Sequence, residues 1–289
     1  MCGIAGLFLK NPSLEPALGR MLSGMLSALT DRGPDSAGFA IYGAGAPGQL
    51  KYTLRSAGGF NLPQGLELSC TAHDDHAVIT FPVAREAEVR AALAARPEIT
   101  IVATGARMEL FKGVGLPDAV TKRFGLEKMS GSHAIGHTRM ATESAVTTAG
   151  AHPFSTGADQ CLVHNGSLSN HNDVRRVLMR EGITFATQND TEVAAGYLSH
   201  QLREGKKLNE ALTNALDRLD GFYTFVVGTE NGFGVLRDPV ACKPAVMAET
   251  ADYVAFGSEY RALADLPGIE AAHLFEPEPG QVYFWERAA

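Results

Sequence analysis

Cys2 stands directly behind the initiator methionine and in front of a short apolar run, in the stretch MCGIAGLF. Removal of Met1, which the small side chain of Cys2 permits, would leave one residue with both a thiol and a free α-amino group. A thiol has a pKa near 8.5 and an α-amino group one of about 7.7 to 8.0, so the amine can accept the thiol proton at neutral pH. Cys2 is therefore a candidate nucleophile that carries its own base. The alternative is a small apolar residue buried in the first strand.

Two further stretches contain groups that could bind a carboxylate or a developing oxyanion. Arg139 lies in GHTRMATES, at the expected end of a strand, and its guanidinium could bind a carboxylate through two parallel hydrogen bonds. Asn165 and Gly166 end the strand-like part of LVHNGSLSN, and a side-chain amide and a glycine N–H could both point at an oxyanion. A surface salt bridge and an ordinary turn are the alternative interpretations.

Two charged turns complete the set of candidates. Asp190, in QNDTE, is expected at the first turn of a helix, where it could pair with a substrate ammonium group or only interact with the helix dipole. Arg32 and Asp35, in DRGPDSAG, could brace each other across a tight turn. Taken singly, each of these stretches also has a purely structural interpretation.

Other polar clusters do not predict a site. The HDDH stretch, residues 73–76, has metal-ligand residue types, but successive side chains of a turn or strand do not converge on one ion. The cysteines are far apart and show no zinc or thioredoxin spacing, so neither a structural disulfide nor a metal site is expected; they are Cys2, Cys70, Cys161 and Cys242. The histidines that flank the candidate strands are interpreted as hydrogen-bonding scaffold; they are His133, His137, His152 and His164.

The elements that must position these residues are strands and helices in mixed order. A strand at residues 2–9 precedes an amphipathic helix over 14–31. The strands GFAIY and QLKYTLRSA are expected to form a hairpin through GAGAPG, and residues 60–130 read as a separate αβ insertion. Strands at HAIGHTRM and QCLVHNG lead to a helix at 172–180 and another at 189–203, with Asn189 and Glu192 forming a capping box.

The C-terminal part of the chain predicts a further helix and several strands. LNEALTNALDRL is helical, and GFYTFVVGTENGFGVLRD is two strands joined at Asn231-Gly232. AVMAE, YVAFGS and QVYFWE continue the strand pattern. Hairpins rather than strict βαβ alternation favour packed mixed or antiparallel sheets covered by helices.

Composition excludes several classes of function. The net charge of −7 argues against general attraction to nucleic acid or anionic membrane, and 45% hydrophobic residues are typical of a globular protein. No stretch approaches the roughly 20 apolar residues of a membrane span, and no signal peptide is evident. We expect a cytoplasmic protein with a small-molecule substrate or a protein partner.

Taken together, the motifs resemble those of class II glutamine amidotransferases, which have an N-terminal nucleophile. The matching runs span most of the chain outside the insertion; they are CGIAGLF, RGPDSAG, GHTRMAT, HPFS, VHNGSLSN and NDTE. The resemblance implies one αββα domain, a four-layer sandwich of two facing antiparallel sheets, over residues 1–289. It also implies roles for individual residues: Cys2 as nucleophile, Asn165 and Gly166 as oxyanion hole, and Arg139, Asp190, Arg32 and Thr142 as substrate-binding residues.

Within that family the chain is most similar to stand-alone amidotransferase subunits of glutamate-synthase-like complexes, including N-methylglutamate synthase. After Arg139 it has Met140, where several members have Trp, and Glu143-Ser144, where they have His-Gly. The resemblance implies hydrolysis of L-glutamine to L-glutamate and ammonia through a γ-glutamyl thioester. Because the chain ends soon after the matched region, we expect the acceptor-using domain on a separate partner subunit that carries FMN and an iron–sulfur cluster, with no cofactor or metal on this chain.

Two other functions remain open at this point. One is a non-catalytic subunit that keeps the fold in order to assemble or regulate the complex. The other is an N-terminal-cysteine hydrolase that acts on other amides, against which Arg139 and Asp190 argue, because together they describe a free α-amino acid.

Overall fold

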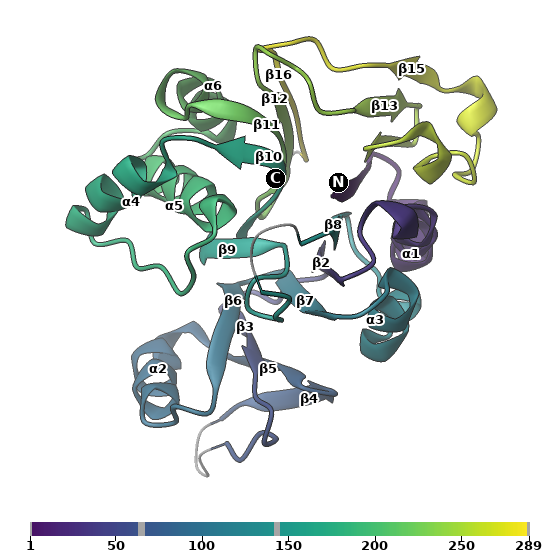
Figure 1. Cartoon of the computed structure of the whole chain (residues 1–289). Coiled ribbons are helices and arrows are strands. Elements are labelled where there is room, and N and C mark those ends of the chain that lie inside the picture. Colours follow the sequence, from purple (N-terminus) through teal and green to yellow (C-terminus); the bar gives the residue numbers. More distant parts are fainter. Residues whose placement is uncertain (1, 63–66, 142–144, 288–289) are drawn as a thin grey trace.

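Two antiparallel sheets lie face to face in the computed structural model, which describes residues 2–62, 67–141 and 145–287 (Figure 1). Among these residues the larger sheet has seven strands, in the spatial order β15 (His273–Phe275), β13 (Val246–Glu249), β14 (Tyr253–Gly257), β1 (Gly3–Leu9), β8 (His133–Arg139), β2 (Ser36–Tyr42) and β7 (Met108–Val114). The second has five, in the order β16 (Val282–Glu286), β12 (Gly232–Arg237), β11 (Gly221–Gly228), β10 (Gln160–Leu168) and β9 (Phe154–Gly157).

Strand β1 shows why the sequence forms stacked layers. Side chains alternate between the two faces of a strand. Ile4 and Phe8 belong to the buried cluster between the sheets, whereas Leu7 and Leu9 belong to the cluster under the outer helices. Gly6 lets the sheets approach closely, because a Cβ there would lie 2.8 Å from the ring of Phe233. This strand is therefore apolar on both faces and fully buried.

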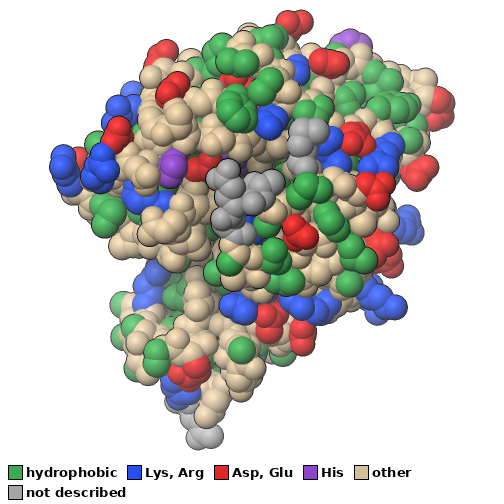
Figure 2. Space-filling view, viewed as in Figure 1, with side chains coloured by type: hydrophobic (Ala, Val, Ile, Leu, Met, Phe, Trp, Pro, Cys, Tyr) green, Lys and Arg blue, Asp and Glu red, His purple; other side chains and the backbone are tan. Residues whose placement is uncertain are grey.

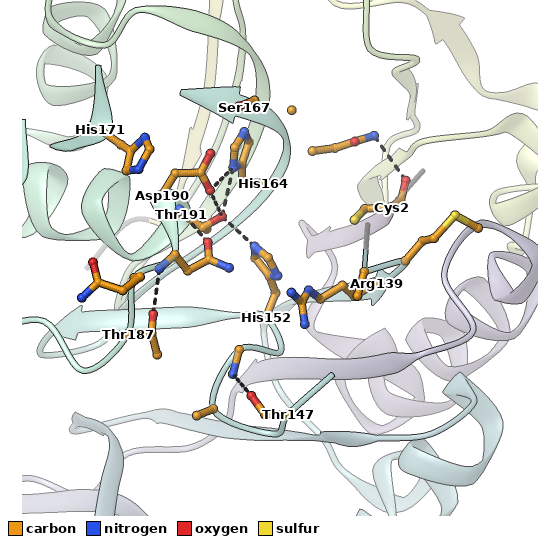
Figure 3. Close-up of a pocket in the computed structure, with 18 of the residues that line it drawn as sticks. Cys2, Arg139, Thr147, His152, His164, Ser167, His171, Thr187, Asp190 and Thr191 are labelled. Carbon is orange, nitrogen blue, oxygen red and sulfur yellow. Dashed lines mark hydrogen bonds and ion pairs between the residues drawn. The ribbon is translucent and has the colours of Figure 1, made fainter. Parts of the chain in front are cut away.

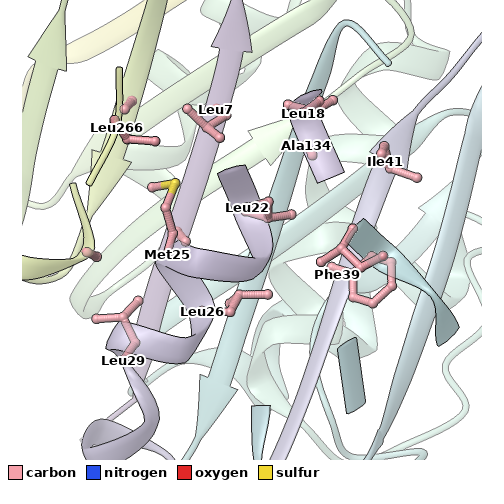
Figure 4. Close-up of a cluster of buried hydrophobic side chains, with 14 of the residues drawn as sticks. Leu7, Leu18, Leu22, Met25, Leu26, Leu29, Phe39, Ile41, Ala134 and Leu266 are labelled. Atoms are coloured by element: carbon pink, nitrogen blue, oxygen red, sulfur yellow. The ribbon is translucent and has the colours of Figure 1, made fainter. Parts of the chain in front are cut away.

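Helices cover the outer face of each sheet. The larger sheet is covered by α1 (Leu18–Ala28) and α3 (Pro117–Phe124), and the five-stranded sheet by α4 (His171–Arg180), α5 (Asp190–Arg203) and α6 (Leu208–Arg218). Leu22, Met25 and Leu26 of α1 pack onto the large sheet beside Leu7 and Phe39 (Figure 4). The predicted four-layer αββα sandwich is confirmed. None of the helices in the described part of the chain is long and apolar enough to cross a bilayer.

A third sheet forms a separate lobe (Figures 1 and 2). Its strands, in spatial order, are β4 (Ser69–His73), β5 (His76–Pro82), β3 (Gln49–Arg55) and β6 (Thr100–Gly105). Helix α2 (Glu86–Ala94) packs on this sheet through Val89 and Leu93, which share a small core of their own with Tyr52 and Phe81. The lobe therefore has the sheet, helix and core of an inserted unit.

The lobe occupies different residues from those predicted for the insertion. Its elements begin at β3 and end at β6, residues 49–105, rather than 60–130. Within the predicted range, β7 and α3 belong to the sandwich, and β7 pairs with β2 from Ser36↔Val114 to Tyr42↔Met108. The predicted GAGAPG hairpin was wrong, because β2 pairs with β7 and β8 while β3 pairs with β5 and β6.

The first predicted helix was too long. A 3-10 turn, η1, covers Pro12–Ala17, and the α-helix begins only at Leu18 and ends at Ala28. Proline has no backbone N–H and disfavours the helical conformation of the residue before it, and Pro16 lies inside the predicted range. The remaining 3-10 turns are η2 (Thr30–Arg32), η3 (Val83–Arg85), η4 (Leu126–Lys128), η5 (Tyr260–Ala262) and η6 (Ile269–Ala271). The hairpin predicted at Asn231-Gly232 is present between β11 and β12.

Candidate active site

A cavity of about 710 Å³ opens where β8 and β10 meet the start of α5. Five residues predicted from the sequence line it together: Cys2, Arg139, Asn165, Gly166 and Asp190. Cys2 directly precedes β1 and Arg139 ends β8, both strands of the larger sheet, whereas Asp190 begins α5 in the helical layer beyond the other sheet (Figure 3). The cavity therefore brings a thiol, a cation, an anion and an amide to one place.

Cys2 is held by its own carbonyl oxygen. It precedes β1, which lies between β8 and β14 in the larger sheet. The carbonyl accepts hydrogen bonds from Arg32 Nε at 3.0 Å and from Asn165 Nδ2 at 3.2 Å. Two side chains thus fix the backbone of the candidate nucleophile without using its sulfur.

Arg32 lies behind Cys2. Its Nη1 donates to Glu259 at 2.7 Å, and this bond lowers the pKa of the Glu259 carboxyl. Arg32 is 8% exposed and is not among the described residues that line the cavity. These contacts suit a residue that positions Cys2, and the assignment of Arg32 to substrate binding stays a prediction.

Asn165 and Gly166 lie near the end of β10, where the strand pairs with β11. Gly166 has φ +149, and a Cβ at this position would lie 2.0 Å from the carbonyl oxygen of Phe222, so a larger residue does not fit. Asn165 is 4% exposed and its amide lies beside Cys2. This geometry places amide donors next to the thiol-bearing residue, as an oxyanion hole requires.

Arg139 ends β8 and is 5% exposed. Its Nη1 lies 3.4 Å from the carbonyl oxygen of Ala145. A Cβ on Gly150 would lie 3.4 Å from the same nitrogen, so the backbone of residues 145–150 passes close to the guanidinium. A buried guanidinium that lines a cavity suits a carboxylate ligand.

Asp190 begins α5, and Asn189 caps the helix by accepting the Thr191 N–H at 2.8 Å. Asp190 Oδ2 accepts the Leu168 N–H at 3.0 Å, and Oδ1 lies 3.7 Å from His164 Nδ1. Burial alone raises the pKa of Asp190, but the contacts with His164 and Leu168 outweigh it and lower the pKa to about 2. Asp190 is thus a fixed anion at the cavity wall.

The predicted capping box was wrong. The carboxylate of Glu192 accepts from the backbone of Ala186 at 2.7 Å and of Thr187 at 2.8 Å, while the Asn189 N–H donates to Thr187 Oγ1 at 3.1 Å. Glu192 therefore holds the loop before α5 rather than the cap residue itself. Sequence spacing alone does not reveal this longer reach.

Three buried histidines form a polar layer under the cavity. His137 and His152 stack with ring centroids 4.0 Å apart. Thr191 Oγ1 lies 2.7 Å from His152 Nε2 and 2.9 Å from His164 Nδ1. Burial lowers the pKa of His137 to about 3 and that of His152 well below its usual range, so both are neutral at physiological pH. These contacts match the scaffold role predicted for them.

A second loop at the cavity was not predicted as functional. Lys243 lines the cavity, with Nζ 4.9 Å from the centroid of the Phe222 ring. Arg237 Nη2 donates to the carbonyl oxygens of Ala241 at 2.8 Å and Lys243 at 3.0 Å. Ala241 has φ 52, in the left-handed region. The contribution of this loop to the cavity depends on its backbone conformation, which residue types alone do not show.

Two other stretches were considered from the sequence. Residues 73–76 form the turn between β4 and β5, and within the described ranges no group of three or more His, Cys, Asp or Glu side chains could hold a metal ion. Thr142, and with it Glu143 and Ser144, lies outside the described residues, as does Met1. The assignment of Thr142 to substrate binding stays a prediction.

Comparison with known proteins connects this cavity with a family. A family model described as a glutamine amidotransferase domain matches residues 137–265. The glutamine amidotransferase-like protein GlxB of Rhizobium meliloti (strain 1021) is 62% identical over 99% of this chain and 98% of its own length.

Solved structures carry the same fold. One, of the allosteric regulatory enzyme of purine biosynthesis, has a TM-score of 0.67 at 22% identity, over 99% of this chain and 47% of that chain. Glutamine phosphoribosylpyrophosphate amidotransferase from B. subtilis has a TM-score of 0.64 with the same identity and coverage. With the full-length relative and the N-terminal-nucleophile fold together, the chain belongs to the class II glutamine amidotransferase family of enzymes.

Proposed function

We propose that this enzyme hydrolyses L-glutamine to L-glutamate and ammonia through a γ-glutamyl thioester on Cys2. The observation that carries the proposal is the placement of Cys2, Arg139 and Asp190 around one cavity. The cation and the anion suit the α-carboxylate and the α-ammonium group of a free amino acid. The side-chain amide of such a ligand then points toward the cysteine.

The reaction follows from these groups. Once Met1 is removed, the α-amino group of Cys2 accepts the thiol proton, and the sulfur attacks the side-chain amide carbon of glutamine. Asn165 and Gly166 stabilise the negative oxygen of the tetrahedral intermediate. The C–N bond then breaks and ammonia leaves with the proton held by the α-amino group. Water attacks the thioester carbon, releases glutamate and restores the thiol.

We further propose that the ammonia passes to a separate glutamate-synthase-like partner that carries FMN and an iron–sulfur cluster, in a cytoplasmic hetero-oligomer. N-methylglutamate synthase is the candidate complex. Support comes from the motif resemblance to stand-alone amidotransferase subunits of such complexes.

The test has two measurements on the purified protein. The intact mass shows whether Met1 has been removed, and an assay of glutamate released from glutamine, with and without the candidate synthase subunits, measures turnover. Cys2→Ala should abolish turnover, whereas Cys70→Ala, which removes an exposed thiol on β4, should leave it unchanged. Hydroxylamine should divert the thioester to γ-glutamyl hydroxamate. A retained Met1, together with no turnover in the complex, would instead make the chain a structural or regulatory subunit.

A further inference from the structure

Lys112 is a buried cation near the cavity that the proposed reaction does not use. It lies on β7, opposite Gly38 of β2, and is 7% exposed. Its Nζ donates to the carbonyl oxygens of Ala151 at 2.9 Å, Ala149 at 3.2 Å and Pro153 at 3.3 Å. These three acceptors satisfy all three ammonium donors.

Among the residues that the structure describes, no carboxylate pairs with this ammonium group. None of the ion pairs within the described residues includes Lys112. Its Nζ also lies 4.4 Å from the centroid of the Phe154 ring. Burial lowers the pKa of Lys112 to about 7, while Glu192 acts in the opposite direction and Arg55 adds to the lowering. A buried cation costs folding free energy unless its hydrogen bonds are complete, and here backbone carbonyls complete them.

The carbonyls that Lys112 binds belong to a wall of the cavity. We call residues 145–153 the carboxylate wall, because Ala145 and Gly150 lie beside the Arg139 guanidinium. At its far end, His152 hydrogen-bonds Thr191, the neighbour of Asp190. The carboxylate wall therefore lies beside Arg139 at one end and contacts the neighbour of Asp190 at the other, and these are the two charged residues that would bind the proposed substrate.

Gly38 shows how tightly this wall is seated. A Cβ on Gly38 would lie 2.2 Å from the carbonyl oxygen of His152 and 2.6 Å from Cβ of Lys112. The wall thus rests on β2 at one residue and is held by the ammonium group of the neighbouring strand. Without that group, the carbonyl oxygens of Ala151 and Pro153 would lose a buried donor and that of Ala149 a part-buried one, which favours a displaced wall.

We propose that Lys112 is a positioning residue for glutamine: its ammonium group fixes the carboxylate wall and so holds Arg139 and Asp190 in the geometry that binds the substrate. This inference rests on the proposed glutamine hydrolysis. It assigns Lys112 to the positioning of the binding residues and not to the chemical step, because Lys112 is not among the described residues that line the cavity with Cys2.

The test compares Lys112→Met, which keeps the length of the side chain without donors, with Lys112→Gln, which keeps two N–H donors. We expect the glutamine KM to rise at least tenfold in Lys112→Met, with kcat within about threefold of wild type. The glutamine KM of Lys112→Gln should lie between those of wild type and Lys112→Met. Binding of glutamine to both variants in a Cys2→Ala background, measured by calorimetry, should follow the KM values.

A matched control separates positioning from general stability. Lys51 on β3 is partly buried and pairs with Glu109 of β7 at 2.7 Å, away from the cavity. Lys51→Met should lower the melting temperature without changing the glutamine KM. Hydrogen exchange of the amides in residues 145–153 should accelerate in Lys112→Met and stay at the wild-type rate in Lys51→Met.

The outcomes are distinguishable from those of the proposed function. If wild type neither binds nor hydrolyses glutamine, the proposed function fails and this inference fails with it. If wild type binds glutamine and Lys112→Met shows unchanged KM, affinity and exchange, only the role of Lys112 is overturned. If Lys112→Met does not fold, Lys112→Gln provides the test. An unchanged glutamine KM and unchanged hydrogen exchange of residues 145–153 in Lys112→Gln would equally overturn the role of Lys112.

Discussion

At the scale of single residues, the cavity is built by charges that the protein holds in place before any ligand arrives. The Asp190 carboxylate is bonded to the Leu168 N–H and lies near His164, and its pKa is lowered to about 2. The carboxylate therefore stays ionised through the whole physiological pH range. Such preorganised charges bind a substrate without first having to reorder.

Exchange of Asp190 for Asn is the first prediction. The amide oxygen of Asn can still accept the Leu168 N–H, but the charge that faces a substrate ammonium group is gone. Since hydrogen bonds to charged groups contribute about 1.5–3 kcal/mol, the glutamine KM should rise at least tenfold, more than kcat falls. Steady-state kinetics measure both, with Asp173→Asn on the exposed side of α4 as control. An unchanged KM would contradict the role given to Asp190.

A residue of the cavity could be predicted from the sequence where its own side chain has the reactive or binding group and where it lies in a short recognisable motif. Cys2, Arg139, Asn165 and Asp190 follow this rule, and the structure places all four at one cavity. Lys112 does not follow it. Its partners are backbone carbonyls of a segment far along the chain, and no residue type in the sequence marks such acceptors.

At the scale of elements, the loop after β12 holds a residue in an unusual backbone conformation. Ala241 has φ 52, where residues with a Cβ are disfavoured by roughly 1–2 kcal/mol. Hydrogen bonds from Arg237 and to Asp238 hold the loop in that shape. The loop carries Lys243 to the cavity, so its shape bears on the site.

Ala241→Gly should therefore stabilise the protein. Glycine adopts positive φ readily, so the substitution removes backbone strain from the folded state. This stabilisation should exceed the cost of the greater conformational freedom of glycine in the unfolded chain, so the free energy of unfolding should rise by about 0.5–1 kcal/mol. Denaturant titration at neutral pH measures it. The matched control is Ala91→Gly in the middle of α2, which should lose about 1 kcal/mol. A loss in Ala241→Gly would show that the loop does not depend on this conformation.

The elements predicted well are those with a clear local signal, such as the β11–β12 hairpin at Asn231-Gly232. Those predicted poorly depend on contacts distant in sequence. Strand β3 was placed in a hairpin with β2, whereas its partners β5 and β6 give it a separate sheet. Helix α3 was missed although Pro117 at its start and Gly125 at its end, with φ 72, are typical helix signals.

At the scale of the whole molecule, buried neutral histidines make the free energy of unfolding depend on pH. Burial lowers the pKa of His133 and His137 to about 3 each, and that of His152 well below its usual range. In the unfolded chain these groups titrate near pH 6.5. Between pH 6.5 and about 3 the unfolded state therefore binds more protons than the folded state, so acidification favours unfolding.

We expect the free energy of unfolding to fall by about 1.4 kcal/mol per pH unit for each such histidine as the pH drops below about 6.5. Denaturant titrations at pH 7, 6 and 5 measure the slope. His133 lies away from the cavity and stacks on Tyr42, so His133→Gln should reduce the slope by one histidine's share without touching the site. A slope equal to that of wild type would contradict the assignment.

The register of β2 and β7 also has an engineering consequence. Tyr42 stands opposite Met108 in the ladder, so the chain departs from the sandwich and returns to it at adjacent points. Apart from Ala103, which belongs to the core between the two sheets, the lobe between them can then be treated as an exchangeable cassette, replaceable by a short turn or by a fluorescent reporter without a change in strand order. Because Met108 begins the strand that carries Lys112, a reporter grafted there would sit at the start of the strand that holds the carboxylate wall.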